Sequence, residues 1–214
     1  AAVAPGALAD EPQAEAACLS APRSQAVPAC EAALAARPGD LALRRKLAWS
    51  YLAGYRETDA LALLAAIAEE QPDDAAAQFD LAAAAAGLRD YPRALAALRV
   101  ALRLAPGELR ILRLGARLYE ETGAPAAAFA LHRRLALAGQ PIGMFDLAED
   151  YAQGRGTEPN QQHARTWYTR AAEAGHVMAM TVLAAKLDSR AFGTAPDPDG
   201  AAFWRRRAEE ATRD

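Results

Sequence analysis

The chain alternates between stretches of small apolar residues and short polar turns, and the alternation recurs at a fixed interval. Pro38, Pro72 and Pro106 are evenly spaced, since 72 − 38 = 34 and 106 − 72 = 34. A constant period of about this length is typical of stacked helical hairpins, in which every repeat contributes two helices. The pattern therefore predicts a repeat protein built from α-helices.

The repeat that runs from Pro72 to Pro106 illustrates one such hairpin. Residues 75–88 are mostly Ala, Leu and Phe, which favour a first helix. The polar turn at residues 87–90 interrupts the pattern, and Pro92 then lies in the first turn of a second helix, where its missing N–H costs nothing. Pro106 disfavours helix at the residue before it and so ends the unit.

Apolar, small and aromatic residues recur at fixed sites within these hairpins. In two successive repeats these sites are Leu47, Ala48, Tyr51, Ala60, Leu64, Ile67 and Pro72, and then Leu81, Ala82, Ala85, Ala94, Leu98, Ala101 and Pro106. A third copy carries Leu114, Gly115, Leu118, Ala127 and Leu131 and ends at Gly139 in place of a proline. This set resembles the tetratricopeptide repeat (TPR) over about residues 26–139.

Beyond residue 139 the spacing changes, because a longer loop with paired glycines joins the two helices. The matching residues are Leu147, Tyr151, Gly154, Gly156, Ala164, Trp167, Tyr168, Ala171, Ala172, Gly175 and Ala179. A second copy repeats three of them 37 residues later, as Ala201, Trp204 and Ala208. This region, about residues 140–211, resembles the Sel1-like repeat.

Both resemblances imply an all-α, right-handed α-solenoid of antiparallel helical hairpins, with about ten helices between Ala26 and Ala211. The expected organisation is a flexible segment at residues 1–17, TPR-like repeats at 18–139 and Sel1-like repeats at 140–214.

The N-terminal residues and the two cysteines bear on the compartment. Ala7-Leu8-Ala9 before Asp10 has the small-x-small form of a signal-peptidase site, although an Ala-rich disordered tail would look the same. We expect Cys18 and Cys30 to form a disulfide that caps the first repeat, the alternative being two buried thiols in a cytosolic protein. The interpretation is a periplasmic or secreted protein, with a cytoplasmic location as the alternative.

Charge and hydropathy exclude two classes of partner. The formal net charge is −3 with a sequence pI of about 5.7, which provides no basic field for nucleic acid. The longest uncharged apolar run, Leu61 to Ala68, is far shorter than the roughly 20 residues that span a bilayer. We therefore expect neither a nucleic-acid partner nor a membrane span.

The sequence contains no catalytic or metal-binding motif. His132, His163 and His176 do not cluster, and no Cys or carboxylate near them has metal-ligand spacing. The four serines lie in no nucleophile motif, and there is no glycine-rich phosphate loop. The sequence therefore predicts no enzyme activity, no metal and no cofactor.

The TPR resemblance implies a concave groove lined by the first helices of successive repeats. The residues placed there by register are Arg45, Trp49, Leu52, Phe79, Leu112 and Tyr119. The groove is expected to hold another protein or a peptide, with Trp49 as the main anchor, because Trp is enriched among residues that dominate binding energy. The alternative is that Trp49 and Phe79 are ordinary core residues. The arginine run at 205–207 is read as a solvated face, and as the next place to look for a partner.

The functional interpretation is a non-enzymatic adaptor or scaffold for other proteins. Mixed TPR and Sel1-like chains resemble bacterial periplasmic scaffolds of polysaccharide export, which is an analogy of architecture alone. The alternatives are a cytosolic regulatory or chaperone-like adaptor and an accessory subunit of an enzyme.

Overall fold

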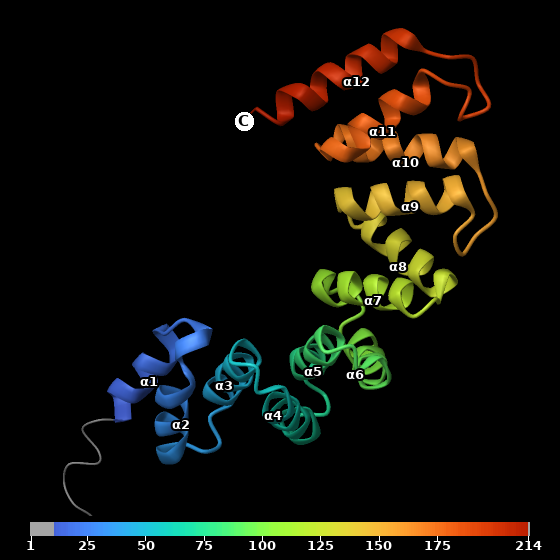
Figure 1. Cartoon of the computed structure of the whole chain (residues 1–214). Coiled ribbons are helices and arrows are strands. Elements are labelled where there is room, and N and C mark those ends of the chain that lie inside the picture. The colour runs from blue at the N-terminus through green and yellow to red at the C-terminus, as the bar shows by residue number, and fades with distance from the viewer. Residues whose placement is uncertain (1–10, 214) are drawn as a thin grey trace, which may run out of the picture. The chain divides into compact units, whose positions relative to one another are not determined.

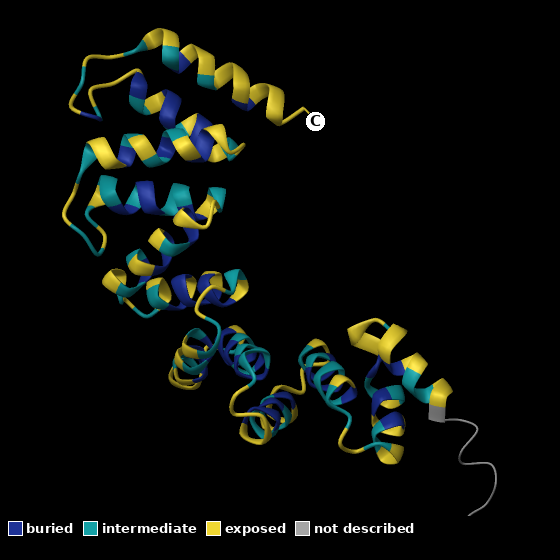
Figure 2. Cartoon of the chain, turned by 180° about the vertical axis from the view of Figure 1, so that it is seen from behind, coloured by how far each residue is buried: buried dark blue, intermediate teal, exposed yellow. Residues whose placement is uncertain are grey.

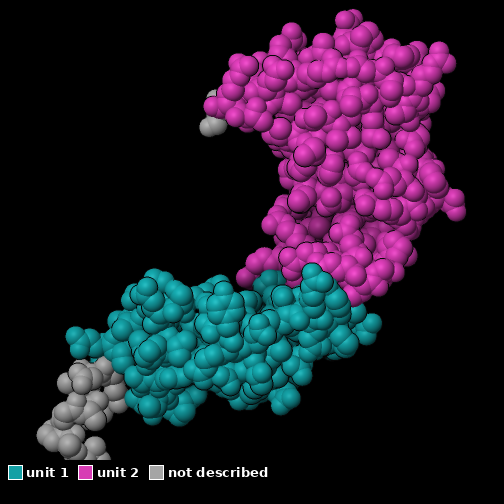
Figure 3. Space-filling model, in the orientation of Figure 1, with its two compact units in different colours: residues 1–106 teal, residues 107–214 magenta. Residues whose placement is uncertain are grey.

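A computed structural model of the protein describes residues 11–213, which form α-helices joined by short turns and, at residues 154–160 and 188–197, by longer loops (Figure 1). No strand occurs within these residues, and successive helices pair as antiparallel hairpins, so the predicted all-α repeat fold is confirmed. The chain divides into two compact units, residues 1–106 and residues 107–214 (Figure 3). We describe each unit by itself. The candidate signal-peptidase site at residues 7–9 lies outside the described residues.

Unit 1 contains six α-helices and one short 3-10 turn within its described residues. They are α1 (Glu11–Ser20), η1 (Arg23–Gln25), α2 (Val27–Ala36), α3 (Leu41–Ala53), α4 (Glu57–Glu70), α5 (Ala75–Gly87) and α6 (Tyr91–Leu104). Three of the helices begin at an aspartate: the carboxylates of Asp40, Asp74 and Asp90 accept hydrogen bonds from backbone N–H groups in the first turns of α3, α5 and α6. These caps satisfy donors that a helix leaves unpaired and so fix where each helix begins.

Buried and exposed residues alternate along the helices of unit 1 (Figure 2). Most of the apolar sites that the repeats share are buried. Leu64, Ile67 and Ala48 are fully buried in one core cluster, which α3, α4 and α5 build together. The side chains that point away from neighbouring helices are exposed. Within unit 1, the α3–α4 hairpin thus packs against α2 on one side and against α5 on the other, which is how a repeat array is stabilised.

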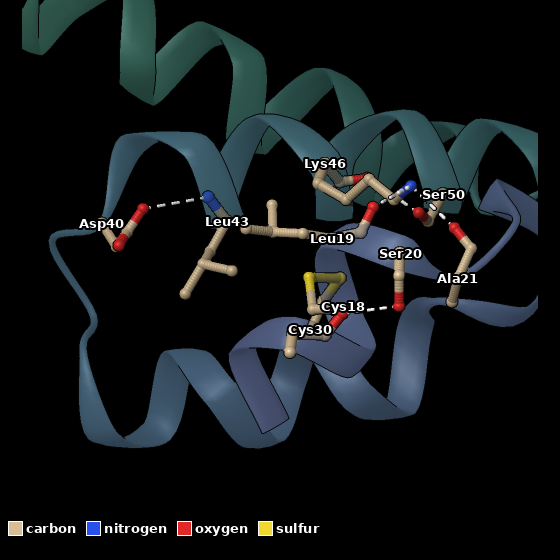
Figure 4. The surroundings of a disulfide bond; sticks show 10 residues. Cys18, Leu19, Ser20, Ala21, Cys30, Asp40, Leu43, Lys46 and Ser50 are labelled. Atoms are coloured by element: carbon tan, nitrogen blue, oxygen red, sulfur yellow. Dashed lines mark hydrogen bonds between the residues drawn. A yellow bond between two sulfur atoms is a disulfide. The ribbon is translucent and has the colours of Figure 1, made fainter. Parts of the chain in front are cut away.

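The N-terminal expectation requires a correction. Residues 11–17 were expected to be part of a flexible segment, but Glu11–Ser20 form helix α1, which packs against α2 and α3. The disulfide between Cys18 and Cys30 joins α1 to α2 with a Cα to Cα distance of 4.6 Å, as expected (Figure 4). Lys46 of α3 donates hydrogen bonds to the carbonyl oxygens of Leu19 and Ala21, and so holds the end of α1 from the other side (Figure 4).

Unit 2 also contains six helices within its described residues. They are α7 (Leu109–Glu121), α8 (Pro125–Leu137), α9 (Pro141–Gln153), α10 (Gln161–Glu173), α11 (Val177–Leu187) and α12 (Pro198–Ala211). Each packs against the next along the chain. Eleven helices therefore lie between residues 27 and 211, one more than the approximate count predicted from the sequence.

The Sel1-like signature residues make the contacts between these helices. Ala164, Ala171 and Ala179 are fully buried, because small side chains let α10 and α11 approach closely. Gly156 has a positive φ of 71°, and a Cβ at this position would lie 2.3 Å from the carbonyl oxygen of Pro125. The longer loop between α9 and α10 therefore needs glycine at this position in order to pack on the start of α8.

The division into units does not coincide with the change of repeat type. The expected boundary lay between residues 139 and 140, where the sequence passes from TPR-like to Sel1-like repeats. The compact units divide between Pro106 and Gly107 instead, because α8 packs against α9 and joins the third TPR-like hairpin to the Sel1-like hairpins. The resemblance and the packing thus divide the chain at different places.

Candidate functional site

In unit 1, one ion pair sets the register of α3 against α5. The Nε of Arg45 donates to the Oδ2 of Asp80 at 2.6 Å, and its Nη2 donates to the carbonyl oxygen of Ala76 at 3.4 Å. The Asp80 side chain is only 9% exposed and that of Arg45 29% exposed. Removing either partner would leave a charge in a poorly hydrated position, so Arg45 has a structural role that the sequence did not suggest.

Apolar side chains lie around this ion pair on the first helices of two successive hairpins. Trp49 and Leu52 on α3 and Phe79 and Ala83 on α5 are all half-buried. The guanidinium of Arg23 lies 5.2 Å from the centre of the Trp49 ring, a distance at which cation–π attraction operates. These four residues, which we call the α3–α5 face, are partly exposed to solvent, although Leu52 also packs against two core clusters of the unit.

The other two predicted groove residues belong to unit 2. Leu112 of α7 is 2% exposed, whereas Tyr119, two helical turns further on, is half-buried. A buried Leu112 packs inside the unit and offers no apolar surface to a partner. The predicted set is therefore distributed over two units, and its members differ in accessibility.

Unit 2 holds a cluster of ionisable side chains that the sequence analysis did not identify. His132 of α8 is 1% exposed, and its Nδ1 lies 2.6 Å from the Oδ2 of Asp150 on α9. Its Nε2 lies 3.8 Å from the Oε1 of Glu120 on α7. Arg155, in the loop after α9, places its Nε 3.1 Å from the other carboxylate oxygen of Asp150. Three helices and one loop thus meet around a buried imidazole.

The surroundings shift the pKa of His132 upward. Burial disfavours the charged ring, but the hydrogen bond to Asp150 and the nearby carboxylates of Asp150, Asp146 and Glu120 outweigh it and raise the pKa. The imidazolium form is therefore favoured at this junction. It is held by Asp150, which is itself paired with Arg155.

Asp146 of α9 is close enough to this cluster for its members to affect its proton affinity. Burial and the nearby carboxylates raise its pKa to about 6, although His132 and Arg155 act in the opposite direction. Within residues 11–213 its carboxylate forms no ion pair or hydrogen bond. It lines an open groove of about 320 Å³ between α7 and α9, together with Arg113, Arg117 and Ile142. Asp146 is thus a carboxyl group that gains or loses a proton near neutral pH.

Sequence reasoning missed these pairings because the two partners of each pair are far apart along the chain. Arg45 and Asp80 are 35 positions apart, and His132 and Asp150 are 18 apart. One signal was present: an aspartate inside an otherwise apolar helical stretch, as in Phe79-Asp80-Leu81, is costly to bury and needs a partner.

The remaining candidate chemistry is limited. Among the residues that the structure describes, no group of three or more His, Cys, Asp or Glu side chains is arranged to hold a metal ion. None of the described helices has the length and hydropathy required to cross a bilayer. His176 caps α11 by accepting a hydrogen bond from the N–H of Ala179, and burial lowers its pKa. The arginines at 205–207 are exposed, as expected, and one of them pairs with Asp188.

Comparison with known proteins supports the fold. The sequence matches no protein-family model and no curated protein. Among solved structures, it is similar to a Sel1 repeat protein from Oxalobacter formigenes, with 22% identity and a TM-score of 0.56, covering 86% of this chain and 76% of that one. It is also similar to MamA, with 17% identity and a TM-score of 0.61, covering 83% of this chain and 99% of MamA.

A third similar structure is c5321, a protective antigen of uropathogenic Escherichia coli strains that displays an SLR fold. The identity is 20% and the TM-score 0.69, over 95% of this chain but only 46% of c5321, so this chain spans about half of that protein. These similarities, together with the helical hairpins described above, define a TPR/Sel1-like repeat fold. Proteins with such folds present extended surfaces to other proteins.

Proposed function

We propose that this protein is a non-enzymatic adaptor that holds another protein against the α3–α5 face, and that it acts in a bacterial cell envelope. The observation that carries the binding proposal is the half-buried apolar set of Trp49, Leu52, Phe79 and Ala83 on adjacent first helices. Exposed apolar surface costs free energy in water, and on a soluble protein it usually marks an interaction site.

The ion pair between Arg45 and Asp80 supports the same proposal. It fixes the register of α3 against α5, so the aromatic side chains on either side are positioned before a partner arrives. A preorganised surface loses less conformational entropy on binding than a mobile one. Arg45 therefore stabilises the packing of the two helices that form the α3–α5 face, whereas Trp49 is the side chain that contacts the partner.

The test is capture of the native partner by Trp49→Ala. We expect capture to weaken by about 30-fold, which corresponds to the roughly 2 kcal/mol that a dominant aromatic contributes. The matched control is Tyr55→Asn, which removes an aromatic side chain that is 89% exposed at a positive φ that Asn tolerates. The proposal fails if Trp49→Ala loses stability but captures the partner as well as the parent does.

The disulfide is the support for the envelope location. Disulfides persist in oxidising compartments such as the periplasm and are rare in the cytosol of mesophiles. Alkylation of thiols in rapidly quenched native cells, with and without reductant, tests this assignment. Cys18 and Cys30 should resist alkylation until reductant is added, and alkylation of both without reductant would place the protein in the cytosol.

A further inference from the structure

The groove between α7 and α9 belongs to unit 2, whereas the α3–α5 face belongs to unit 1. Its volume is about 320 Å³, and its lining includes His132 of α8 and Arg113 and Arg117 of α7. Ile142, on the opposite side, is 49% exposed. The groove thus combines two guanidinium groups and one accessible aliphatic side chain on two adjacent helices.

Both arginines retain hydrogen-bonding capacity for a ligand. Arg113 uses one Nη2 donor on the side-chain oxygen of Gln140. Arg117 is 60% exposed, and its Nε lies 3.8 Å from the carboxylate of Glu121, a surface pair that contributes little. Since a guanidinium has five N–H donors, each arginine can still bind a carboxylate. Their spacing of four residues places both on one side of α7.

The two carboxyl groups of the groove do not cancel this positive charge at mildly acidic pH. Glu120 is directed towards His132, whose raised pKa favours the charged imidazolium. Asp146 is half protonated near pH 6 because it is buried and faces Glu120 of α7 and Asp150 of α9, with His132 of α8 and Arg155 acting against them. A protonated carboxyl group can itself donate a hydrogen bond to a carboxylate.

We propose that the α7–α9 groove binds an acidic segment of a partner protein, whose carboxylates pair with Arg113 and Arg117 while an aliphatic side chain contacts Ile142. This proposal builds on the adaptor function but concerns another surface. A bound carboxylate stabilises the protonated form of Asp146, so binding takes up a proton from the solution. A cationic ligand would do the reverse and release one.

The direct test is isothermal titration at pH 6 with three synthetic peptides of 12 residues. All are acetylated and amidated, so that no terminal carboxylate contributes, and they contain Leu with either Glu, Gln or Lys. Titration in two buffers of different ionisation enthalpy gives the number of protons exchanged. We expect the Glu peptide to bind at least about tenfold more tightly than the other two, with net proton uptake.

Variants then assign the effect to the groove. Arg113→Gln with Arg117→Gln should weaken binding of the Glu peptide about tenfold, since each exposed ion pair is worth about two- to fivefold. Arg133→Gln is the control for the loss of one positive charge, because it removes a charge from an exposed position of α8 outside the groove, and it is compared with Arg113→Gln and Arg117→Gln taken singly. Asp146→Asn should abolish most of the proton uptake while the Glu peptide still binds.

Four results would overturn the proposal: tighter binding of the Lys peptide with proton release, no binding of the Glu peptide, an equal loss of affinity for Arg133→Gln, or unchanged proton uptake in Asp146→Asn. The first would reassign the groove to a basic segment. Trp49→Ala should bind the Glu peptide like the parent protein. If this proposal fails, the proposal that the α3–α5 face binds a partner is not affected. If that face fails to capture a partner, the result of the peptide titration is not affected.

Discussion

The same four residues, Phe-Asp-Leu-Ala, occur in both units and have different electrostatic surroundings. In α5 they are residues 79–82, and Asp80 is paired with Arg45 of α3. In α9 they are residues 145–148, and Asp146 forms no ion pair within the described part of the chain. The two aspartates differ because of the repeat that precedes each motif, and not because of the motif itself.

Repeat register explains the difference. Arg45 lies two residues before Leu47. Leu114 is the site equivalent to Leu47 two repeats later, and the residue two positions before it is Leu112. Leu112 is 2% exposed and carries no charge. The repeat that precedes α9 therefore has no cation at the position where Arg45 pairs with Asp80 of α5. One aspartate therefore stabilises helix packing, whereas the other has a pKa of about 6.

The largest expected effect comes from making unit 1 resemble unit 2. Arg45→Leu would leave Asp80 buried without its cation, and should lower the free energy of unfolding of unit 1 by about 3 kcal/mol. Hydrogen exchange followed by mass spectrometry would localise the loss to α3 and α5. The control is Arg44→Leu, which breaks an ion pair with a 55% exposed Glu70 and should cost at most about 1 kcal/mol. Equal losses in the two variants would refute a special role for Arg45.

The next effect tests how far the two units are independent. Cys30→Ser removes a cross-link between residues 12 positions apart in unit 1, which the loop-entropy estimate values at up to about 3 kcal/mol. We expect α1 and α2 to exchange amide hydrogens faster under oxidising conditions, while α10 and α11 keep the protection of the parent. Unchanged exchange in α1 would show that the contacts of Lys46 with Leu19 and Ala21 are sufficient to hold that helix.

The smallest effect is the change in stability when the aspartate of each motif is replaced by asparagine, and it has opposite signs in the two motifs. A carboxyl group with a raised folded-state pKa binds its proton more tightly in the folded state, so it reduces stability as the pH rises from about 4 to 6. Asp146→Asn should therefore stabilise unit 2 by about 1 to 2 kcal/mol at pH 8 and have little effect at pH 4. Asp80→Asn, the same change in the other motif, should destabilise unit 1 at pH 8.

Denaturation at several pH values would measure both variants. His132 contributes in the same direction in the parent protein: its raised pKa provides stability that is present below about pH 6.5 and is lost as the pH rises through the folded-state value. Unit 2 should thus be more stable at pH 5 than at pH 8. If Asp146→Asn destabilised unit 2 at pH 8, the carboxylate would have an ionic partner in solution.

Much of the architecture could be predicted from the sequence. Proline spacing, small residues at helix contacts and paired glycines are local requirements of a hairpin, and each is visible along the chain. The site was predictable only in part: Trp49, Leu52 and Phe79 lie half-buried on adjacent helices, but Leu112 is buried. Counting along the chain gives Leu112 a register position, whereas its accessibility depends on which neighbouring helices cover that position.

The sequence by itself determined the repeat period, the helical hairpins and a pair of cysteines close enough along the chain to be joined. The tertiary structure alone decided the electrostatics. Whether Asp146 carries a charge depends on side chains many positions away, brought near by packing, and on how much water remains around its carboxylate. Local preference fixes the helices, because it acts within a few residues. Coulombic interaction and desolvation act across space, so the proton affinity of Asp146 could be read only from the folded chain.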